Sequence, residues 1–144
     1  MSGATGKHRA TFRVYYEDTD AAGIVYHANY LRFAERARTE MMREWGFDHP
    51  ALRERFGVQF AVRRCRIEFL GPARLDEMLT VETEVLEARG ARLELRQRIA
   101  TERGPAAEIA ITLALVDLRM RPVRVARFLP PAALAAASPP PPVP

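Results

Sequence analysis

Two aspartates separated by one threonine, Asp18 and Asp20, open the stretch DTDAAGIVYHANY (residues 18–30). Carboxylates at this spacing can bind a metal ion, act on a substrate, or accept bonds from backbone amides in an Asx turn. A calcium loop is disfavoured because Asn29 stands at its twelfth position, where a bidentate glutamate is needed. An aspartyl phosphatase motif also fits poorly, because Ala22 has the wrong side chain for it. Taken alone, the motif favours a solvated turn.

The residues that follow change this interpretation. Gly23 permits a close approach of the backbone to a ligand, and the run of residues that includes Val25 supplies a hydrophobic wall. A helix is expected a few residues later, with free N–H groups and a partial positive charge at its start. A carboxylate and amide donors would then converge on an apolar site. This combination suits hydrolysis of an ester-like carbonyl, in which the acid activates water or attacks directly and the helix start holds the oxyanion.

The sequence lacks the residues for other kinds of hydrolytic chemistry. The only serines are Ser2 and Ser138, near the two ends of the chain, so neither a serine triad nor a GxSxG elbow is expected. Cys65 falls in the middle of an expected strand with no histidine nearby in sequence, and we predict a buried, inert thiol. The three histidines lie far apart and form no HExxH motif, so no metal is expected. A metal-free carboxylate is the remaining hydrolytic option.

The elements around the motif follow from hydrophobic periodicity. Residues 11–16 alternate apolar and polar side chains, which predicts a half-buried strand that ends at the acids. From Tyr30 to Trp45 the apolar residues recur at helical spacing, and this predicts one amphipathic helix of roughly 25 Å. We expect Asn29 to be the N-cap of this helix and Gly46 to end it.

Four further strands are expected after a polar connection. The hydrophobic pattern changes phase near Arg63 and Arg64, which indicates a bulge, and Gly71-Pro72 ends that strand. A tight turn at Gly90 separates two alternating stretches, which predicts a hairpin. The expected strands are residues 58–70, 79–88, 92–101 and 108–118. Short links make consecutive strands antiparallel, and one long helix must bury its apolar stripe against them, so the predicted class is α+β.

Length and composition fit a single domain. A chain of 144 residues suits one core, and we place the domain at residues 1–128. Residues 129–144 contain seven prolines and no charged residue, and a disordered or extended tail is expected there. The net charge is +4, but most arginines alternate with glutamate as on a solvated face. No recognition motif accompanies that charge, so no nucleic-acid partner is expected.

The cellular setting is read from what the chain contains. One cysteine cannot form an internal disulfide, so a reducing compartment is expected. The first ten residues have no apolar core of a signal peptide. No stretch approaches the roughly 20 apolar residues needed to cross a bilayer. We therefore expect a cytoplasmic protein with no transmembrane segment.

A longer stretch, RVYYEDTDAAGIVYHANYLRFAERARTEM (residues 13–41), resembles the signature of the hotdog-fold acyl-CoA thioesterases of the 4-hydroxybenzoyl-CoA thioesterase type. It is most similar to the branch associated with the bacterial Tol-Pal cell-envelope system. The likeness continues through FAVRRCRIEFLGPARLDEMLTVETEV and VDLRMRPVR. The resemblance implies a hotdog fold, an antiparallel sheet of about five strands wrapped around one long central helix. It also implies hydrolysis of acyl-CoA thioesters to a free acid and coenzyme A, with no separate cofactor.

Carried over by position, the family's catalytic carboxylate falls on Asp20. The amide that polarises the thioester carbonyl falls on the backbone of His27, and the His27 side chain is a second candidate, as a proton carrier. Tyr16 can contribute its hydroxyl to the site or only pack, and we favour packing. The residues expected to contact the substrate are Gly23, Val25, Tyr26, Tyr30, Glu35, Arg89 and Arg92. Arg89 and Arg92 flank the hairpin where similar thioesterases carry basic groups for the nucleotide; surface solvation is the alternative for both.

The family reading also implies partners. Two chains are expected to join their sheets edge to edge, as a dimer or a dimer of dimers, with Glu35 reaching the site from the partner's helix. An acyl carrier protein is an alternative donor, because it shares phosphopantetheine with coenzyme A. A non-catalytic hotdog module that binds acyl groups or scaffolds an envelope complex is the rival from another class. The branch implies a cytoplasmic location that can extend to the surface of the inner membrane.

Overall fold

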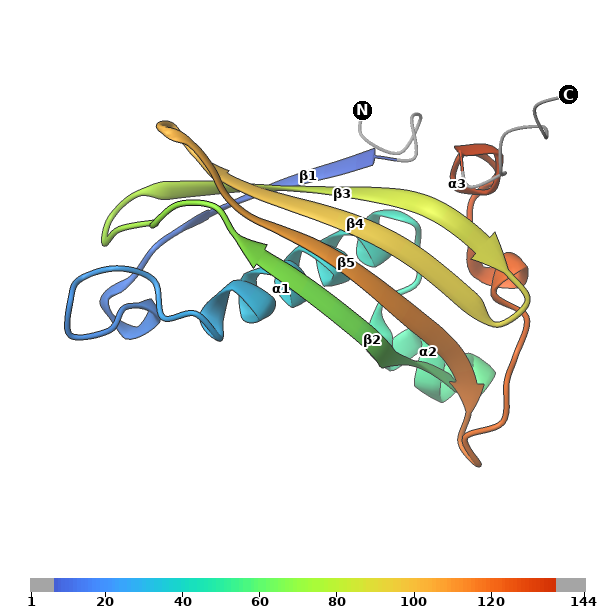
Figure 1. Cartoon of the computed structure of the whole chain (residues 1–144). Coiled ribbons are helices and arrows are strands. Elements are labelled where there is room, and N and C mark those ends of the chain that lie inside the picture. The colour runs from blue at the N-terminus through green and yellow to red at the C-terminus, as the bar shows by residue number, and fades with distance from the viewer. Residues whose placement is uncertain (1–6, 137–144) are drawn as a thin grey trace, which may run out of the picture.

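The computed structural model describes residues 7–136, which form one antiparallel sheet with a long helix across it (Figure 1). The strands follow the order β1-β3-β4-β5-β2, so β1 and β2 are the two edges. The strands are β1 (Lys7–Arg13), β2 (Val58–Phe69), β3 (Met78–Arg89), β4 (Arg92–Thr101) and β5 (Gly104–Asp117). The helices are α1 (Asn29–Glu44), α2 (His49–Phe56) and α3 (Pro131–Ala136), with short 3-10 turns η2 (Tyr16–Asp18) and η3 (Val125–Phe128). This is the predicted α+β arrangement.

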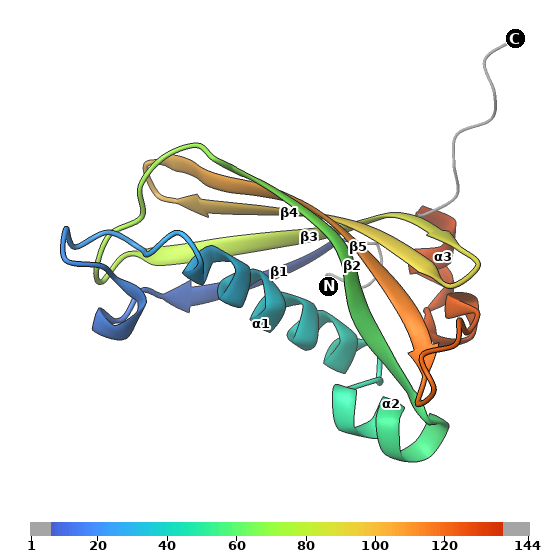
Figure 2. The same cartoon turned by 60° about the horizontal axis from the view of Figure 1, so that its bottom comes forward.

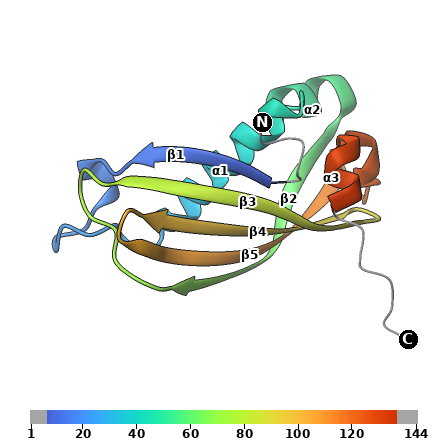
Figure 3. The same ribbon diagram turned by 90° about the horizontal axis from the view of Figure 1, so that it is seen from above.

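The core lies between α1 and the face of the sheet that it crosses (Figure 2). Phe33, Ala37 and Met41 recur every fourth residue, so they share one side of α1, and all three are buried. The sheet meets them with alternate residues such as Leu95 and Ile109, which are fully buried. Seen from above, β1, β3, β4 and β5 run side by side over this helix (Figure 3). Burial of this apolar layer is the main stabilising contribution to the fold.

A buried polar cluster interrupts the apolar layer at the middle of α1. Gln97 on β4 has no exposed surface; its Nε2 donates to Ala34 O (2.8 Å) and to Thr83 Oγ1 (3.0 Å). Its Oε1 accepts from Nη1 of Arg38 (3.0 Å). Burial lowers the pKa of Arg38, although nearby Glu35 partly offsets this effect. The cluster ties α1 to β3 and β4 through groups that are costly to leave unpaired.

Several boundaries match the predictions, and two do not. The hairpin turn at Gly90 and the bulge in β2, a register shift between Val62 and Arg64, are both confirmed. The first strand was predicted at residues 11–16, but β1 ends at Arg13 and η2 follows. Asn29 was predicted as N-cap, but it is the first helical residue and its side chain caps no backbone group. The cause is a buried acceptor, described below, that draws the Asn29 amide away from the helix.

Helix α2 was not predicted, although its signals stand in the sequence. Asp48 caps it by accepting from the backbone N–H of Ala51 (2.8 Å), and Pro50 occupies the first turn. Gly57 ends it in the left-handed conformation, with φ 63°. A short polar helix leaves little periodicity, so the stretch was interpreted as a connection.

The segment after β5 packs against the sheet, although its composition suggested a disordered tail. Residues 129–136 fell in the expected disordered tail, but Leu129 and Ala133 are buried and α3 lies against β3. Phe128 anchors this segment, with ring centroids 5.6 Å from Phe47 and 5.2 Å from Phe56. A few apolar anchors were enough to hold a segment whose overall composition is proline-rich. The remainder of the expected tail, residues 137–144, lies outside the described residues.

The β2 edge of the sheet is exposed and partly apolar. Val62 is 56% exposed and Phe69 is 53% exposed. Cys65, predicted to be buried, is exposed on the same strand, because β2 has a neighbour on one side only. The prediction was wrong because the pattern showed a strand but not its place at an edge. Within residues 7–136 no helix has the length and hydropathy to cross a membrane.

Candidate active site

The aspartate motif lies in a loop (residues 14–28) that is held by the β2–β3 connection. The backbone N–H of Val14 donates to Glu77 O (2.8 Å), and that of Val25 donates to Ala73 O (2.8 Å). A bridge between Ile24 and Arg74 adds a further pairing between the two segments. Two irregular segments therefore brace one another through backbone bonds, and together they fix the position of the loop relative to the start of α1.

Asp20 opens a tight turn in this loop. The N–H of Gly23 donates to Asp20 O (3.0 Å), and the N–H of Ala22 donates to the Asp20 carboxylate (Oδ1, 2.8 Å). Gly23 has φ 78°, a conformation that favours glycine, so the turn depends on this residue. Asp20 is exposed, and among the described residues its second oxygen, Oδ2, has no hydrogen-bond partner. One oxygen thus orients the carboxylate, while the other remains open.

Asp18 has the opposite environment. It is 3% exposed, and both of its carboxylate oxygens accept hydrogen bonds. Oδ2 accepts from the backbone N–H of Tyr15 (2.8 Å), and Oδ1 accepts from Nδ2 of Asn29 (2.7 Å). The Asx-turn interpretation therefore describes both aspartates in part, but only Asp20 keeps an oxygen available for other chemistry.

The start of α1 presents unused backbone donors. Ala28 is the N-cap residue and offers no side-chain cap, while the N–H of Asn29 donates to Tyr26 O (2.8 Å). In the described chain no acceptor is found for the backbone N–H of His27 or of Ala28. Uncapped amides at a helix start carry partial positive charge and suit a developing negative charge.

Asp20 and the start of α1 meet in one cleft of about 450 Å³. Its lining residues are Asp20, Ile24, Val25, His27, Tyr30, Phe69, Leu70, Gly71 and Pro72. The Phe69 ring lies against the rings of Tyr30 and His27, with centroids 5.7 Å and 6.4 Å apart. The cleft therefore combines one carboxylate and one imidazole with a mostly apolar wall.

Tyr30 forms the floor of the cleft and is held in place. It is 4% exposed, and its hydroxyl oxygen accepts from the backbone N–H of Ala73 (3.2 Å). Burial raises the pKa of Tyr30, and nearby Glu77 raises it further, whereas the Ala73 bond acts the other way. The phenol therefore stays protonated at neutral pH.

Most of the other sequence-predicted residues of the motif lie around this cleft, but not all line it. Gly23 shapes the Asp20 turn, and Val25 forms part of the wall. Tyr26 is 48% exposed and its ring lies beside that of His27, tilted by 47° with centroids 4.4 Å apart, but it does not line the cleft. Tyr16 is 83% exposed, so within this chain it neither packs in the core nor reaches the cleft.

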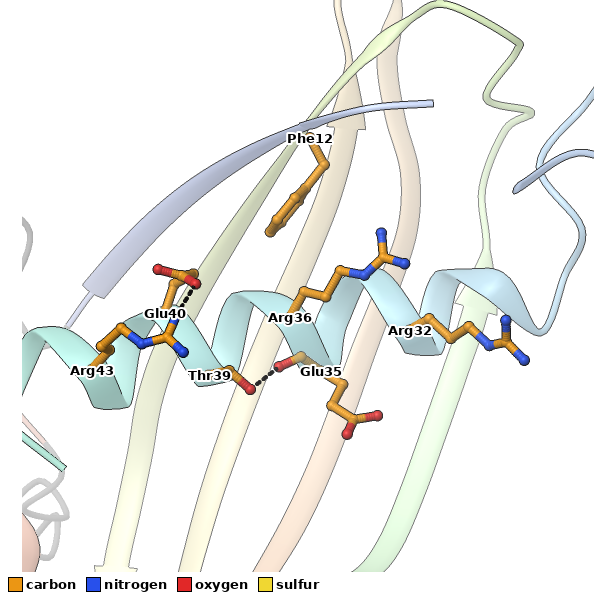
Figure 4. Close-up of a pocket in the computed structure, with 7 residues that line it drawn as sticks. All are labelled: Phe12, Arg32, Glu35, Arg36, Thr39, Glu40 and Arg43. Carbon is orange, nitrogen blue, oxygen red and sulfur yellow. Dashed lines mark hydrogen bonds and ion pairs between the residues drawn. The ribbon is translucent and has the colours of Figure 1, made fainter. Parts of the chain in front are cut away.

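Glu35 lies elsewhere, on the outer face of α1. It lines a broad depression of about 560 Å³ together with Arg32, Arg36 and other charged residues (Figure 4). The Arg43 guanidinium pairs with Glu40 there (2.6 Å). This depression is larger than the Asp20 cleft, but its lining is charged and lacks the helix-start amides. The structure does not bring Glu35 and Asp20 together within one chain.

Arg89 and Arg92 lie at the other end of the sheet, at the β3–β4 turn (Figure 1). Arg92 is in register with Ala114 of β5, whereas Phe69 at the cleft is in register with Ala107. Seven residues of β5 separate these rows, roughly 24 Å at about 3.4 Å per residue. Both arginines are exposed, and neither forms an ion pair within the described residues. One chain therefore cannot bring them to Asp20.

The far wall of the cleft was missed in the sequence. Phe69, Leu70 and Pro72 come from the end of β2 and the residues just after it, about fifty residues after the aspartates. Gly71-Pro72 was recognised only as a strand breaker. The available signal was the apolar Phe69-Leu70 pair directly before that break. No cluster of His, Cys, Asp or Glu suited to hold a metal ion is found in residues 7–136.

A family model and a curated relative both relate this chain to thioesterases. A family model described as the thioesterase-like superfamily matches residues 14–143. The acyl-CoA thioester hydrolase YbgC of Escherichia coli is 50% identical over 113 residues, which cover 76% of this chain and 83% of that protein.

Solved structures with the same fold include a probable thioesterase and a 4-hydroxybenzoyl CoA thioesterase. A probable thioesterase from Bartonella henselae superposes with a TM-score of 0.79 at 36% identity, over 82% of this chain and 98% of that one. The 4-hydroxybenzoyl CoA thioesterase of Pseudomonas sp. strain CBS-3 superposes with a TM-score of 0.78 at 22% identity, over 85% of this chain and 96% of that one. The second likeness concerns the fold alone.

Proposed function

Because this chain belongs to the thioesterase-like superfamily, we propose that it hydrolyses acyl-CoA thioesters to a free acid and coenzyme A. The observation that carries the proposal is the shared cleft of Asp20 and the start of α1. A carboxylate with a free oxygen can supply the base or nucleophile, and uncapped helix amides can stabilise the oxyanion, in hydrolysis of a thioester. The sheet and helix also have the hotdog arrangement of the structural relatives.

Asp20 acts on the thioester in one of two ways. As general base, Asp20 takes a proton from water and the resulting hydroxide adds to the carbonyl carbon. The C–S bond then breaks, and the departing sulfur receives a proton to give the free thiol. As nucleophile its oxygen adds to the carbonyl and expels the thiolate, leaving a mixed anhydride that water cleaves. Both routes need a carboxylate oxygen free to act; Asp20 lines the cleft, and its Oδ2 has no hydrogen-bond partner among the described residues.

The start of α1 stabilises the negative charge that develops on the carbonyl oxygen. The N–H groups of His27 and Ala28 have no acceptor in the described chain, so they are available to donate. Loss of one such donor typically costs about 100-fold or more in turnover number. The His27 imidazole also lines the cleft and is a candidate to protonate the leaving thiolate.

The expected nucleotide contacts of Arg89 and Arg92 would require a second chain. If two β2 strands pair antiparallel about a two-fold axis, the Phe69 end of one strand lies beside the Val58 end of the other. The Val58 end of the sheet carries the β3–β4 turn with Arg89 and Arg92. The partner's arginines would then approach the cleft and the phosphates of coenzyme A. Pairing would also cover the exposed side chains of Val62 and Phe69 on the open edge.

The donor and the cellular partners belong to the same proposal. An acyl carrier protein shares phosphopantetheine with coenzyme A, so the cleft alone does not distinguish the two donors. Tol-Pal association and a place at the inner membrane stay predictions from the resemblance, as does a cytoplasmic location.

The test is release of free thiol by the purified protein from a panel of acyl-CoA esters, from short aliphatic to aromatic, beside matched acyl carrier protein donors. We expect turnover on at least one CoA ester. Turnover only with carrier-protein donors would assign acyl carrier protein, not coenzyme A, as the acyl donor. Binding of acyl-CoA without any thiol release would instead favour the non-catalytic module. The Val62→Glu variant tests pairing through the β2 edge, because it places a charge there. Light scattering should show that this variant is a monomer.

A further inference from the structure

The pair formed by Asp18 and Asn29 is a feature that the proposed chemistry does not itself use. Both side chains are buried, 3% and 6% exposed, and they meet at 2.7 Å. Asp18 lies two residues before the reactive carboxylate, and Asn29 is the first residue of α1. The bond therefore joins the two components of the cleft, the aspartate turn and the helix start.

The backbone around Asp18 connects the same two components. The N–H of Tyr26 donates to Asp18 O (3.0 Å), and Thr19 forms a bridge with Val25. The Asp20 N–H then donates to Ile24 O (2.9 Å). A shift of Asp18 would thus displace both the Asp20 turn and the segment that leads into α1.

The bond holds the helix without capping it. A serine or aspartate at the N-cap would anchor the helix start by accepting from the backbone N–H of Tyr30 or Leu31. Here Ala28 is the N-cap residue, and the Asn29 side chain donates to Asp18. The helix end is anchored through a side chain, and the backbone N–H groups of His27 and Ala28 just before it have no acceptor in the described chain.

The bonding pattern requires a carboxylate at residue 18 while its partner is an asparagine. Asp18 accepts two hydrogen bonds, one from the Tyr15 N–H and one from Asn29 Nδ2. An asparagine at residue 18 has one carbonyl oxygen, so its NH₂ group would face one of these donors. An aspartate at residue 29 would instead place two carboxylates together.

We propose that Asp18 and Asn29 are positioning residues that fix the Asp20 carboxylate relative to the N–H groups at the start of α1. The inference rests on the proposed function, and it adds that this side-chain bond, together with the backbone bonds around it, fixes the distance between the base and the oxyanion donors. A misplacement of about 1 Å in such a site can cost about 100-fold in rate. Neither residue needs to touch the substrate.

The test exchanges the two side chains. We expect Asp18→Asn and Asn29→Asp each to lower kcat by roughly 10- to 100-fold with a smaller change in KM, because substrate still binds but is misaligned. In the double variant, the new amide at residue 18 accepts from the Tyr15 N–H and donates to the new carboxylate at residue 29, so both bonds return. The double variant should recover kcat to within about fivefold of wild type, far above the product of the two single losses.

A matched control separates positioning from stability. Val85→Ala removes buried volume from β3, well away from the cleft, and should lower the melting temperature while leaving kcat unchanged. Single variants with wild-type kcat, or an exchange that restores melting temperature but not kcat, would overturn the inference. A wild-type protein without thioesterase activity would refute the proposed function instead, and Asp20→Asn reports on the base separately from the pair.

Discussion

Two polar clusters contact α1, one at its middle and one at its start, and they use their hydrogen-bonding groups differently. At the middle, Gln97 receives a bond from Arg38 and donates to Ala34 and Thr83, all within the core. At the start, Asp20 keeps one carboxylate oxygen open, and nearby backbone amides have no acceptor in the described chain. The first cluster is closed by its own bonds, whereas the second is open to a ligand.

The difference teaches where this protein places its unsatisfied polar groups. A buried polar group without a hydrogen-bond partner costs about 1–3 kcal/mol, and the side-chain amide of Gln97 is accordingly bonded at both its oxygen and its nitrogen. The cleft keeps its open groups at the surface, where water can satisfy them until substrate arrives. Asp18 belongs to the closed kind although it stands two residues from Asp20. The same residue type therefore serves the fold at one position and is free for chemistry at the other.

The largest expected effect is that of Asp20→Asn on turnover. The change removes the charge but keeps a carbonyl oxygen that can accept from the Ala22 N–H, so the turn should persist. We expect kcat to fall on the order of 1,000-fold, about 4 kcal/mol of barrier, with an unchanged melting temperature. Thiol-release kinetics and thermal unfolding measure the two quantities. A kcat within tenfold of wild type would move the chemistry to another group.

Gln97→Leu should give the converse result at the closed cluster. Leucine has a similar volume, but it leaves the Arg38 guanidinium, the Ala34 carbonyl and the Thr83 hydroxyl without their partner. We expect the free energy of unfolding to fall by about 3 kcal/mol, with kcat per folded molecule preserved. Urea unfolding provides the measurement.

Thr112→Val is the matched control for Gln97→Leu. It removes one hydroxyl that bonds Glu94 at 3.2 Å, away from α1, and should cost about 1 kcal/mol or less. Equal losses for the two variants would mean that the buried cluster has no special weight.

Arg92→Gln tests whether the far end of the sheet serves the open cleft. Through the partner subunit, the lost guanidinium should raise KM for acyl-CoA about fivefold with little change in kcat, the size of an exposed charge contact. The control is Arg9→Gln on the opposite edge strand, where KM should not move. An unchanged KM in Arg92→Gln would assign that arginine to surface solvation.

The smallest effect concerns the β2–β3 connection that braces the cleft. A hydrogen bond from Arg103 lowers the pKa of Glu77, helped by the Arg74 backbone. Because the folded pKa lies below that of the unfolded chain, this contribution is present above the unfolded pKa, near 4.3, and is lost as pH falls through the folded pKa.

The melting temperature of Glu77→Gln should therefore fall a few degrees at most below that of wild type at neutral pH, because the ion pair is partly exposed. The difference should vanish at acidic pH. A gap that widened on acidification would show that Glu77 does not act through this ion pair.

The fold was readable from the sequence where periodicity was strong. The long helix, the hairpin at Gly90 and the β2 bulge follow from spacing that only one arrangement satisfies. Helix α2 and the packing of Leu129 were missed because short segments carry little periodicity and depend on tertiary contacts. The exposure of Cys65 was missed for a related reason, since alternation reports a strand but not whether it lies at an edge.

The candidate site was readable only on the side where its residues are adjacent in sequence. The motif around Asp20 located the turn and the glycine, and it placed the helix start within one residue, because these contacts are local. The wall from Phe69 to Pro72 depends on the pairing of β2 with β5, and no local pattern contains that register. The opposite roles of Asp18 and Asp20 become visible only from their burial and their hydrogen-bond partners. In the sequence the two residues are both aspartates and cannot be told apart.

The central claim is that the thioester is held between residue 20 and the uncapped start of α1. The most direct measurement is a crystal structure of the Asp20→Asn variant with an unreactive thioether analogue of acyl-CoA that retains a carbonyl. The account predicts that this carbonyl oxygen accepts from the N–H groups of His27 or Ala28, with the substituted side chain at residue 20 beside the carbonyl carbon. An analogue seated instead in the depression on the outer face of α1, or with its carbonyl away from the helix start, would contradict it.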